Sequence, residues 1–94
     1  MITIKLLEFG NILTGREKGK GVMALLESRI PSSSELIEFD LDGVISMGSS
    51  FGDEIFPKIA SRQGGTVQVR NANPSIKHCL ALVAQDARIK IEQE

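Results

Sequence analysis

The chain has 94 residues, and its 11 basic and 12 acidic side chains give a formal net charge of −1. This length predicts a single domain, residues 1–94, and the charge balance argues against a dedicated binder of nucleic acid or of anionic membranes. With four Phe and no Trp or Tyr, we expect an aliphatic core and no aromatic platform for stacking bases.

The first strand is predicted from alternation of apolar and polar residues. Residues 2–6 follow the two-residue period of a strand with one buried face. The pair Gly10-Asn11 is typical of a turn, and Ile12-Leu13 is expected to add a brief return strand.

The first helix is predicted over residues 14–30. We expect Thr14 to be its N-cap, with Glu17 three residues later completing a capping box. Four aliphatic residues are expected on its buried face: Val22, Leu25, Leu26 and Ile30. Pro31 should end the helix, and the serines at 32–34 should supply a connection.

The middle of the chain contains a strand, a tight corner and a second helix. Residues 36–39 are typical of a short buried strand, and the small residues 48–50 lead into a helix that runs to about residue 61. Apolar residues recur at every fourth position of this helix, at Phe51, Ile55 and Ile59. Pro57 lacks a backbone donor and is expected to kink or shorten it. The corner therefore places two serines where helix N–H groups and partial positive charge gather.

The last third of the chain predicts a strand, a helix and a strand. Residues 66–70 alternate, and Asn73-Pro74 favours a helix start because Asn is a good N-cap and Pro suits the first helical position. That helix should reach about residue 85, with a last strand over 88–91. The order β, α, β, α, β, α, β predicts an α/β fold with a four- or five-stranded, mixed but mostly parallel sheet and about three helices.

The corner resembles STAS domains, the fold of bacterial anti-sigma factor antagonists, and more closely a divergent STAS-like group of unknown function. In antagonists the middle strand ends in Asp-Leu-x-x-Val-x-x-Met-Asp-Ser-Ser/Thr-Gly-Leu-Gly. Residues 40–53 read Asp-Leu-Asp-Gly-Val-Ile-Ser-Met-Gly-Ser-Ser-Phe-Gly-Asp. Residues 64–71 resemble the family's Gly-Gly strand, and residues 51–54 resemble the Phe-Ala-Asp-Glu helix start of the divergent group. The resemblance covers about residues 14–91.

This resemblance implies a STAS-like bacterial module of signalling and transcription regulation that binds another protein and is not an enzyme. The implied partner is an anti-sigma factor or a histidine-kinase-like ATPase. Antagonists are phosphorylated on the first serine after the acidic residue, which by position is Ser49, although the acidic residue itself is replaced by Gly48 here and the divergent group often has glutamine at the Ser49 position. The implied partner-binding residues are Ser46, Gly48, Ser49, Ser50, Asp53 and Glu54.

A purely structural interpretation of the same serines stays open. Ser50 as N-cap and Asp53 three residues later would form a capping box worth about 1 kcal/mol. A phosphate on Ser49 would instead carry about −1.5 to −2 charges and accept helix N–H bonds. Both hold if Ser50 caps while Ser49 faces outward. Phe51 is expected in the core, with a role as a contact residue as the alternative.

The carboxylates of the middle segment raise the question of a Mg²⁺ site or of acid–base catalysis. They are Asp40, Asp42, Asp53 and Glu54. No histidine lies near them in the sequence, no phosphate-binding glycine loop is present, and Asp42-Gly43 fits a turn. We therefore predict no metal, no cofactor and no catalysis, and the alternative is a small enzyme that uses these carboxylates.

The single histidine, His78, and the single cysteine, Cys79, are neighbours on the predicted third helix. Adjacent helical side chains point about 100° apart, so the pair cannot act together, and we expect Cys79 in the core and His78 in solvent. No stretch reaches the ~18 apolar residues of a membrane span. The sequence thus predicts a cytoplasmic protein with no membrane partner. The alternative function is an accessory domain that senses a small ligand or nucleotide without phosphorylation.

Overall fold

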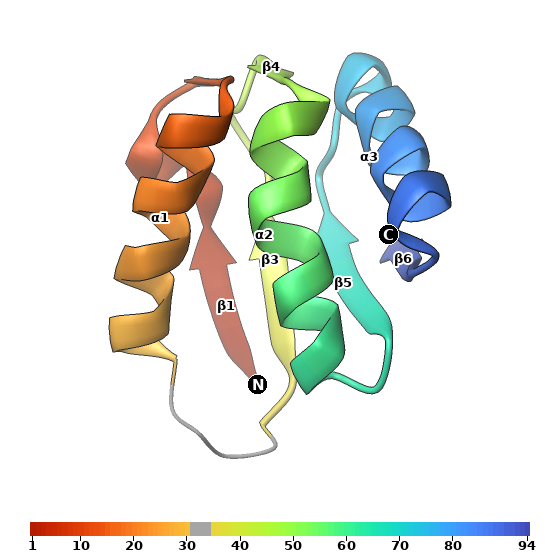
Figure 1. The fold of residues 1–94 in the computed structure, drawn as a ribbon. Helices are drawn as coiled ribbons and strands as arrows, with labels where there is room; N and C mark the ends of the chain where they lie inside the picture. The colour runs from red at the N-terminus through yellow and green to blue at the C-terminus, as the bar shows by residue number, and fades with distance from the viewer. Residues whose placement is uncertain (31–34) are drawn as a thin grey trace.

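The computed structural model describes residues 1–30 and 35–94. Within these residues, three α-helices and two β-sheets confirm the predicted α/β class (Figure 1). The elements in chain order are β1 (Ile2–Lys5), the 3-10 helix η1 (Leu6–Phe9), β2 (Ile12–Leu13), α1 (Arg16–Arg29), β3 (Ile37–Asp40), β4 (Ser46–Met47), α2 (Ser49–Arg62), β5 (Thr66–Arg70), α3 (Pro74–Ala87) and β6 (Lys90–Gln93). The helix end predicted at Pro31 and the connection over 32–34 lie outside the described residues.

The main sheet has the strand order β1-β3-β5-β6, and each neighbouring pair in it is parallel. Each strand is added on the same side of the previous one, so right-handed crossovers place all three helices on one face. Figure 1 shows the helices on that near face. The expected return strand at Ile12-Leu13 does not pair with the first strand. It forms β2, which pairs with β4 in a separate two-stranded parallel sheet.

The two faces of the main sheet differ in chemistry. The helix side carries Ile4, Phe39 and Val67, which are buried, whereas Lys5 and Lys90 on the other side are exposed. This alternation follows from the two-residue period of strands, because only one face is covered by helices. The open face is therefore a solvated surface of charged and polar side chains.

Two acidic residues on the central strand are buried although they lie on the open face. Glu38 is 5% exposed and Asp40 is 7% exposed. Both are covered by Arg70, whose Nε lies 3.3 Å from Glu38 Oε1 and whose Nη2 lies 3.5 Å from Asp40 Oδ2. The Glu38 contact lacks the alignment of a hydrogen bond. Arg70 therefore compensates Glu38 by proximity and donates a long hydrogen bond to Asp40.

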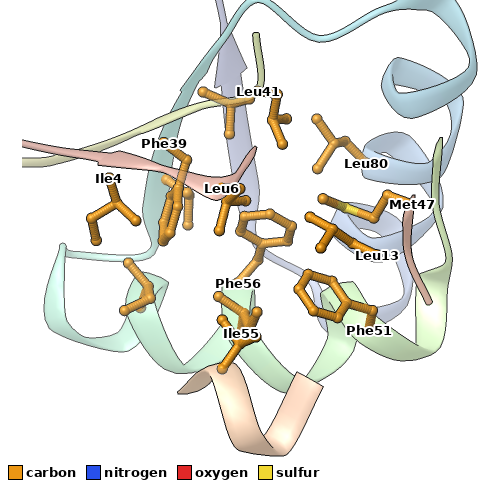
Figure 2. Close-up of a cluster of buried hydrophobic side chains, with 14 of the residues drawn as sticks. Ile4, Leu6, Leu13, Phe39, Leu41, Met47, Phe51, Ile55, Phe56 and Leu80 are labelled. Atoms are coloured by element: carbon orange, nitrogen blue, oxygen red, sulfur yellow. The ribbon is translucent and has the colours of Figure 1, made fainter. Parts of the chain in front are cut away.

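The core lies between the sheet and the helices (Figure 2). Phe39 from β3 and Phe56 from α2 meet edge to face, with ring centroids 5.3 Å apart and an interplanar angle of 87°. Phe51 at the start of α2 is fully buried, so its predicted core role is confirmed and the contact alternative is wrong. Cys79 is also buried, as predicted. With three Phe completely enclosed, aromatic residues fill the centre of a mainly aliphatic core.

Helix α2 packs between α1 and α3, and glycines allow the close approach on both sides. A Cβ at Gly19 of α1 would lie 2.9 Å from the Phe51 carbonyl oxygen, and a Cβ at Gly52 would lie 3.0 Å from Val83 of α3. Gly19 thus takes a buried position in α1, while Leu25 is 49% exposed and the prediction that it is buried is wrong. The helix–helix contact, and not the aliphatic pattern alone, sets the buried face of α1.

Two other helix features differ from the sequence expectations. The N-cap of α1 is Gly15, with φ +92°, and no described side chain caps it, so the capping box of Thr14 and Glu17 is wrong. Helix α2 continues through Pro57 and ends at Arg62, so the proline does not shorten it.

Candidate functional site

The predicted corner lies at the carboxyl end of the main sheet. In Figure 1 the N-termini of α1, α2 and α3 all lie at the upper end of the molecule, together with β4. This arrangement follows from the parallel topology, in which each helix starts beyond the end of a strand. Open α/β sheets bind ligands outside the carboxyl ends of their strands. The corner therefore occupies the end of the fold that such sheets use for recognition.

The segment before α2 is held on one side by β2. The Asn11 carbonyl accepts N–H bonds from Ile45 at 2.8 Å and from Ser46 at 3.3 Å. The Gly48 N–H donates to the Leu13 carbonyl at 2.9 Å. These bonds fix the approach to the helix over four successive residues.

The same segment is held on its other side by the start of α3. The Asn73 side-chain amide donates to the carbonyls of Ile45 at 2.9 Å and Val44 at 3.3 Å. Its oxygen accepts from the Ile76 N–H at 2.9 Å, which confirms Asn73 as the N-cap of α3. One asparagine thus caps its own helix and fastens the neighbouring corner.

Helix α2 begins at Ser49 with Gly48 as its N-cap, and no side chain among the described residues caps it. The predicted capping box of Ser50 with Asp53 is therefore wrong, because Ser50 is already the second helical residue. The physical reason is that Gly48 is anchored to Leu13 and its own carbonyl accepts the first helical bond, from Gly52 at 3.1 Å. The helix thus starts before Ser50 can act as a cap.

Both candidate serines are exposed at this helix start. Ser49 and Ser50 lie on the surface, and Ser46 and Gly48 are half-buried. The first N–H groups of a helix have no acceptor within it, and the partial positive charge of the helix is concentrated there. The corner therefore presents two hydroxyls beside N–H donors that can receive an anionic oxygen.

The two carboxylates of the predicted partner surface face different neighbours. Glu54 Oε2 accepts from Arg16 Nη1 at 2.7 Å, Glu54 Oε1 lies 3.9 Å from Lys58 Nζ, and the Glu54 side chain is 12% exposed. Burial and, to a smaller extent, the nearby Asp53 charge raise the pKa of the Cys79 thiol. Glu54 thus joins α1 to α2, whereas Asp53 lies on the α3 side.

Two exposed aliphatic residues at the corner were not predicted as site residues. Ile12 is 53% exposed and Ile45 is 58% exposed. Ile12 pairs with Ser46 across β2 and β4, while the next pair, Leu13 and Met47, is buried. Strand alternation could have identified Ile12 as outward-facing. We name the four exposed residues Ile12, Ile45, Ser49 and Ser50, together with the half-buried Ser46, the corner surface.

Asp40 lies at the end of β3 and organises the turn that follows. Its Oδ1 accepts from Asn71 Nδ2 and from the Asp42 N–H, both at 2.9 Å. These hydrogen bonds, the Asn71 contact first, and the Arg70 charge hold the pKa of the Asp40 carboxyl below its ordinary value. The predicted turn at Asp42-Gly43 is confirmed, with Gly43 at φ +84°. Asp40 thus joins the ends of β3 and β5.

The remaining titratable candidates lie apart. His78 is exposed on α3 while Cys79 is buried, as the helical spacing predicts. Within residues 1–30 and 35–94, no group of three or more His, Cys, Asp or Glu is arranged to hold a metal ion.

Comparison of the chain with protein-family models, with curated proteins and with solved structures gave no match. The likeness to STAS domains therefore rests on the residues of the corner and on the order of the elements. None of the helices that the structure describes is long and apolar enough to cross a membrane.

Proposed function

We propose that this chain is a STAS-like regulatory module that docks a partner protein through the corner surface, with Ser49 as a phosphoacceptor. The proposed partner is a histidine-kinase-like ATPase or an anti-sigma factor. The observation that carries the proposal is the exposed pair Ser49 and Ser50 at the start of α2, where no described side chain caps the helix.

The apolar part of the corner surface supports docking of a protein. Ile12 and Ile45 are both more than half exposed and flank Ser46. Exposed aliphatic residues that gather at one place are characteristic of interaction sites, whereas isolated ones need no explanation. The backbone beneath them is fixed by β2 and Asn73, so little conformational entropy is lost when a partner binds.

The chemistry of the helix start supports regulation by a phosphate. A phosphate on Ser49 would carry about −1.5 to −2 charges and would be stabilised by the helix N-terminus by about 0.3–1 kcal/mol. The same charge would change the electrostatics that a docked partner meets. Phosphorylation would therefore weaken or redirect docking without unfolding the domain.

Phosphorylation is tested by incubating the protein with ATP and a histidine-kinase-like ATPase encoded beside it, followed by intact-mass measurement and peptide mapping. We expect one added phosphate on the wild type and on Ser50→Ala, and none on Ser49→Ala. Ser50→Ala is the matched control, because both serines are exposed in the first turn of α2. A phosphate on Ser50, or none on the wild type, would contradict the assignment of Ser49.

Docking is tested separately, by calorimetry with the unphosphorylated protein and the same ATPase. We expect Ile45→Ser to weaken the complex at least tenfold. Leu82→Ser is the control, because Leu82 is a similarly exposed aliphatic residue (43%) on α3. Equal affinities for the wild type and Ile45→Ser would exclude the corner surface as the docking site.

A further inference from the structure

Strand β1 forms one edge of the main sheet, and half of its backbone groups point away from the sheet. The Ile2 N–H donates to the Leu36 carbonyl at 2.8 Å, so Ile2 and then Ile4 face β3. Since the direction of backbone groups alternates along a strand, the N–H and C=O groups of Thr3 and Lys5 point outward. The order of strands places no described strand on that side.

A groove with a volume of about 300 Å³ runs beside this edge. Its apolar wall includes Ile2 and Ile4 of β1. It also includes Leu26, near the C-terminal end of α1, and Ile30, the C-cap of that helix. The remaining lining residues are Thr3, Lys5, Glu8 and Arg29. The groove therefore combines outward backbone groups with an apolar slot, which is the combination that recognises an extended peptide by strand addition.

Of the charged residues that line the groove, Lys5 alone has no close counter-ion among the described residues. Arg29 Nη1 lies 2.6 Å from Glu8 Oε1, so these two compensate each other. Among the described residues, Lys5 has no carboxylate within 4.0 Å, although it is near enough to Asp40 to help lower its pKa. The groove thus has a surplus positive charge on the open-face side of β1.

The opposite edge of the sheet, β6, has a different character. Three of its four residues are exposed, and Glu92 is bonded to Gln68 at 2.9 Å and lies 3.4 Å from Lys90. Glu92 is therefore already paired within its own chain, whereas Lys5 of β1 has no carboxylate within 4.0 Å among the described residues. The contrast singles out β1 as the edge with a charge left for a partner strand.

We propose that the groove beside β1 binds an extended segment of another protein as an additional strand, with aliphatic side chains at every second position and acidic side chains between them. An aliphatic side chain of the segment packs on the half-buried Ile2, above the buried Ile4 and Leu26, and an acidic side chain on the open face pairs with Lys5. Outward backbone groups of Thr3 and Lys5 supply the ladder hydrogen bonds. This site lies apart from the corner surface and does not depend on its function.

A second copy of the chain is a poorer occupant of this edge. β1 reads Ile-Thr-Ile-Lys, so a second β1 brings no carboxylate to Lys5. Two-fold pairing would also place both Lys5 side chains on the open face of the joined sheet with no carboxylate from either β1 to compensate them. Charge complementarity therefore favours an acidic segment of a different protein.

The probe is a peptide with blocked ends and the sequence Glu-Val-Glu-Val-Glu-Val, added to the intact protein and followed by NMR. We expect saturable shifts at residues 2–5 and slower hydrogen exchange of the Thr3 and Lys5 amides. Two versions of the peptide, N-methylated at the Glu or at the Val positions, test the geometry. One of them should lose binding and the other keep it, because only alternate N–H groups face β1. Equal behaviour of both versions would overturn strand addition.

Variants of the protein complete the test. Thr3→Pro removes one outward N–H and should abolish binding, whereas Gln93→Pro removes an outward N–H at the β6 edge and should leave it unchanged. The Lys90 N–H at the start of β6 and the Glu94 N–H just after it donate to the carbonyls of Gly65 and Val69. Because N–H directions alternate along a strand, the Gln93 N–H points away from the sheet. Lys5→Glu should weaken binding of the acidic peptide at least tenfold and gain binding to Lys-Val-Lys-Val-Lys-Val.

Three outcomes would overturn the proposal. They are shifts centred on β6, an unchanged affinity in Lys5→Glu, and concentration-dependent protection of the Thr3 and Lys5 amides without peptide. The last outcome would show that a second copy covers the edge. Because the corner surface takes no part in this experiment, its result is independent of phosphorylation at Ser49.

Discussion

Helices α2 and α3 both start at the carboxyl edge of the same sheet, yet only α3 is capped by a described side chain. Asn73 accepts from the Ile76 N–H and also donates to the carbonyls of Val44 and Ile45. Gly48 at the corresponding place before α2 has no side chain to offer. A good N-cap is worth about 1 kcal/mol relative to alanine. A side-chain cap therefore stabilises the start of α3, whereas the first N–H groups of α2 have no acceptor among the described side chains.

The difference indicates that the two neighbouring helix starts have different roles, structural support for α3 and surface chemistry for α2. The α3 start is tied through Asn73 to the segment before β4, and the nearby Asn71 donates to Asp40 at the end of β3. It acts as a rigid support for the segment that leads into α2. The exposed serines of α2 can then change their chemistry without loosening the fold. The following changes test whether the two starts are as different as this comparison states.

The largest effect is expected for Asp40→Ala. The substitution leaves the Asn71 amide and the Asp42 N–H without their acceptor and Arg70 without one of its carboxylates. Hydrogen bonds to charged groups contribute about 1.5–3 kcal/mol each, so we expect a loss of roughly 3 kcal/mol. Urea denaturation monitored by circular dichroism measures this loss. A loss below that of an exposed substitution such as Asp42→Ala would contradict the supporting role.

Acid should weaken the interactions of the Asp40 carboxylate and so destabilise the protein. The folded-state pKa of Asp40 is lowered from 3.8, so its stabilising contribution is complete above the unfolded-state pKa and disappears as pH falls through the lower folded-state pKa. We expect the free energy of unfolding to fall more steeply below about pH 4 in the wild type than in Asp40→Asn. Parallel pH profiles of the two proteins would show that Asp40 does not carry this dependence.

Asn73→Ala should cost about 2 kcal/mol, because it removes both a helix cap and the donor that fastens the corner. Asn73→Asp separates the two contributions, since aspartate keeps the cap and lacks the donor. We expect Asp to recover about half of the loss in thermal and urea unfolding. Full recovery would mean that the bonds to Val44 and Ile45 contribute nothing.

Gly48→Asp should raise the free energy of unfolding, whereas the substitutions above lower it. Gly48 has φ −93°, and a Cβ there would meet only Thr14, at 3.6 Å or more, so a side chain fits. Adding an acidic N-cap should stabilise the protein by about 0.5–1 kcal/mol. Gly48→Ala is the matched control, which adds the Cβ without an acceptor. Equal unfolding midpoints for the two variants would mean that the α2 start was already satisfied.

The smallest effect is expected for Ser50→Ala. Ser50 is exposed and caps nothing among the described residues, so its removal should change the free energy of unfolding by less than about 0.5 kcal/mol. Ser49→Ala should behave alike in the absence of a kinase. A loss of 1 kcal/mol or more in Ser50→Ala would restore the capping role that the structure removes.

What could be predicted from the sequence was decided by short-range signals. Asn73-Pro74 predicted the start of α3 because the cap and its acceptor lie three residues apart. The alternation of residues 66–70 predicted β5 with its bounds, and the four-residue spacing of Phe51, Ile55 and Ile59 predicted the buried face of α2. In each case the residues that interact with the core or the backbone are close together in the chain. The α/β order followed from the same signals.

Tertiary structure decided where α2 begins, which residues flank its serines and which edge of the sheet is open. Gly48 became the N-cap because its N–H is bonded to Leu13, and Gly19 became a buried residue because α2 approaches it. The groove beside β1 likewise needs residues from β1 and from the far end of α1. These features depend on pairs of residues far apart in the chain, and a local pattern carries no information about which distant partner will be met.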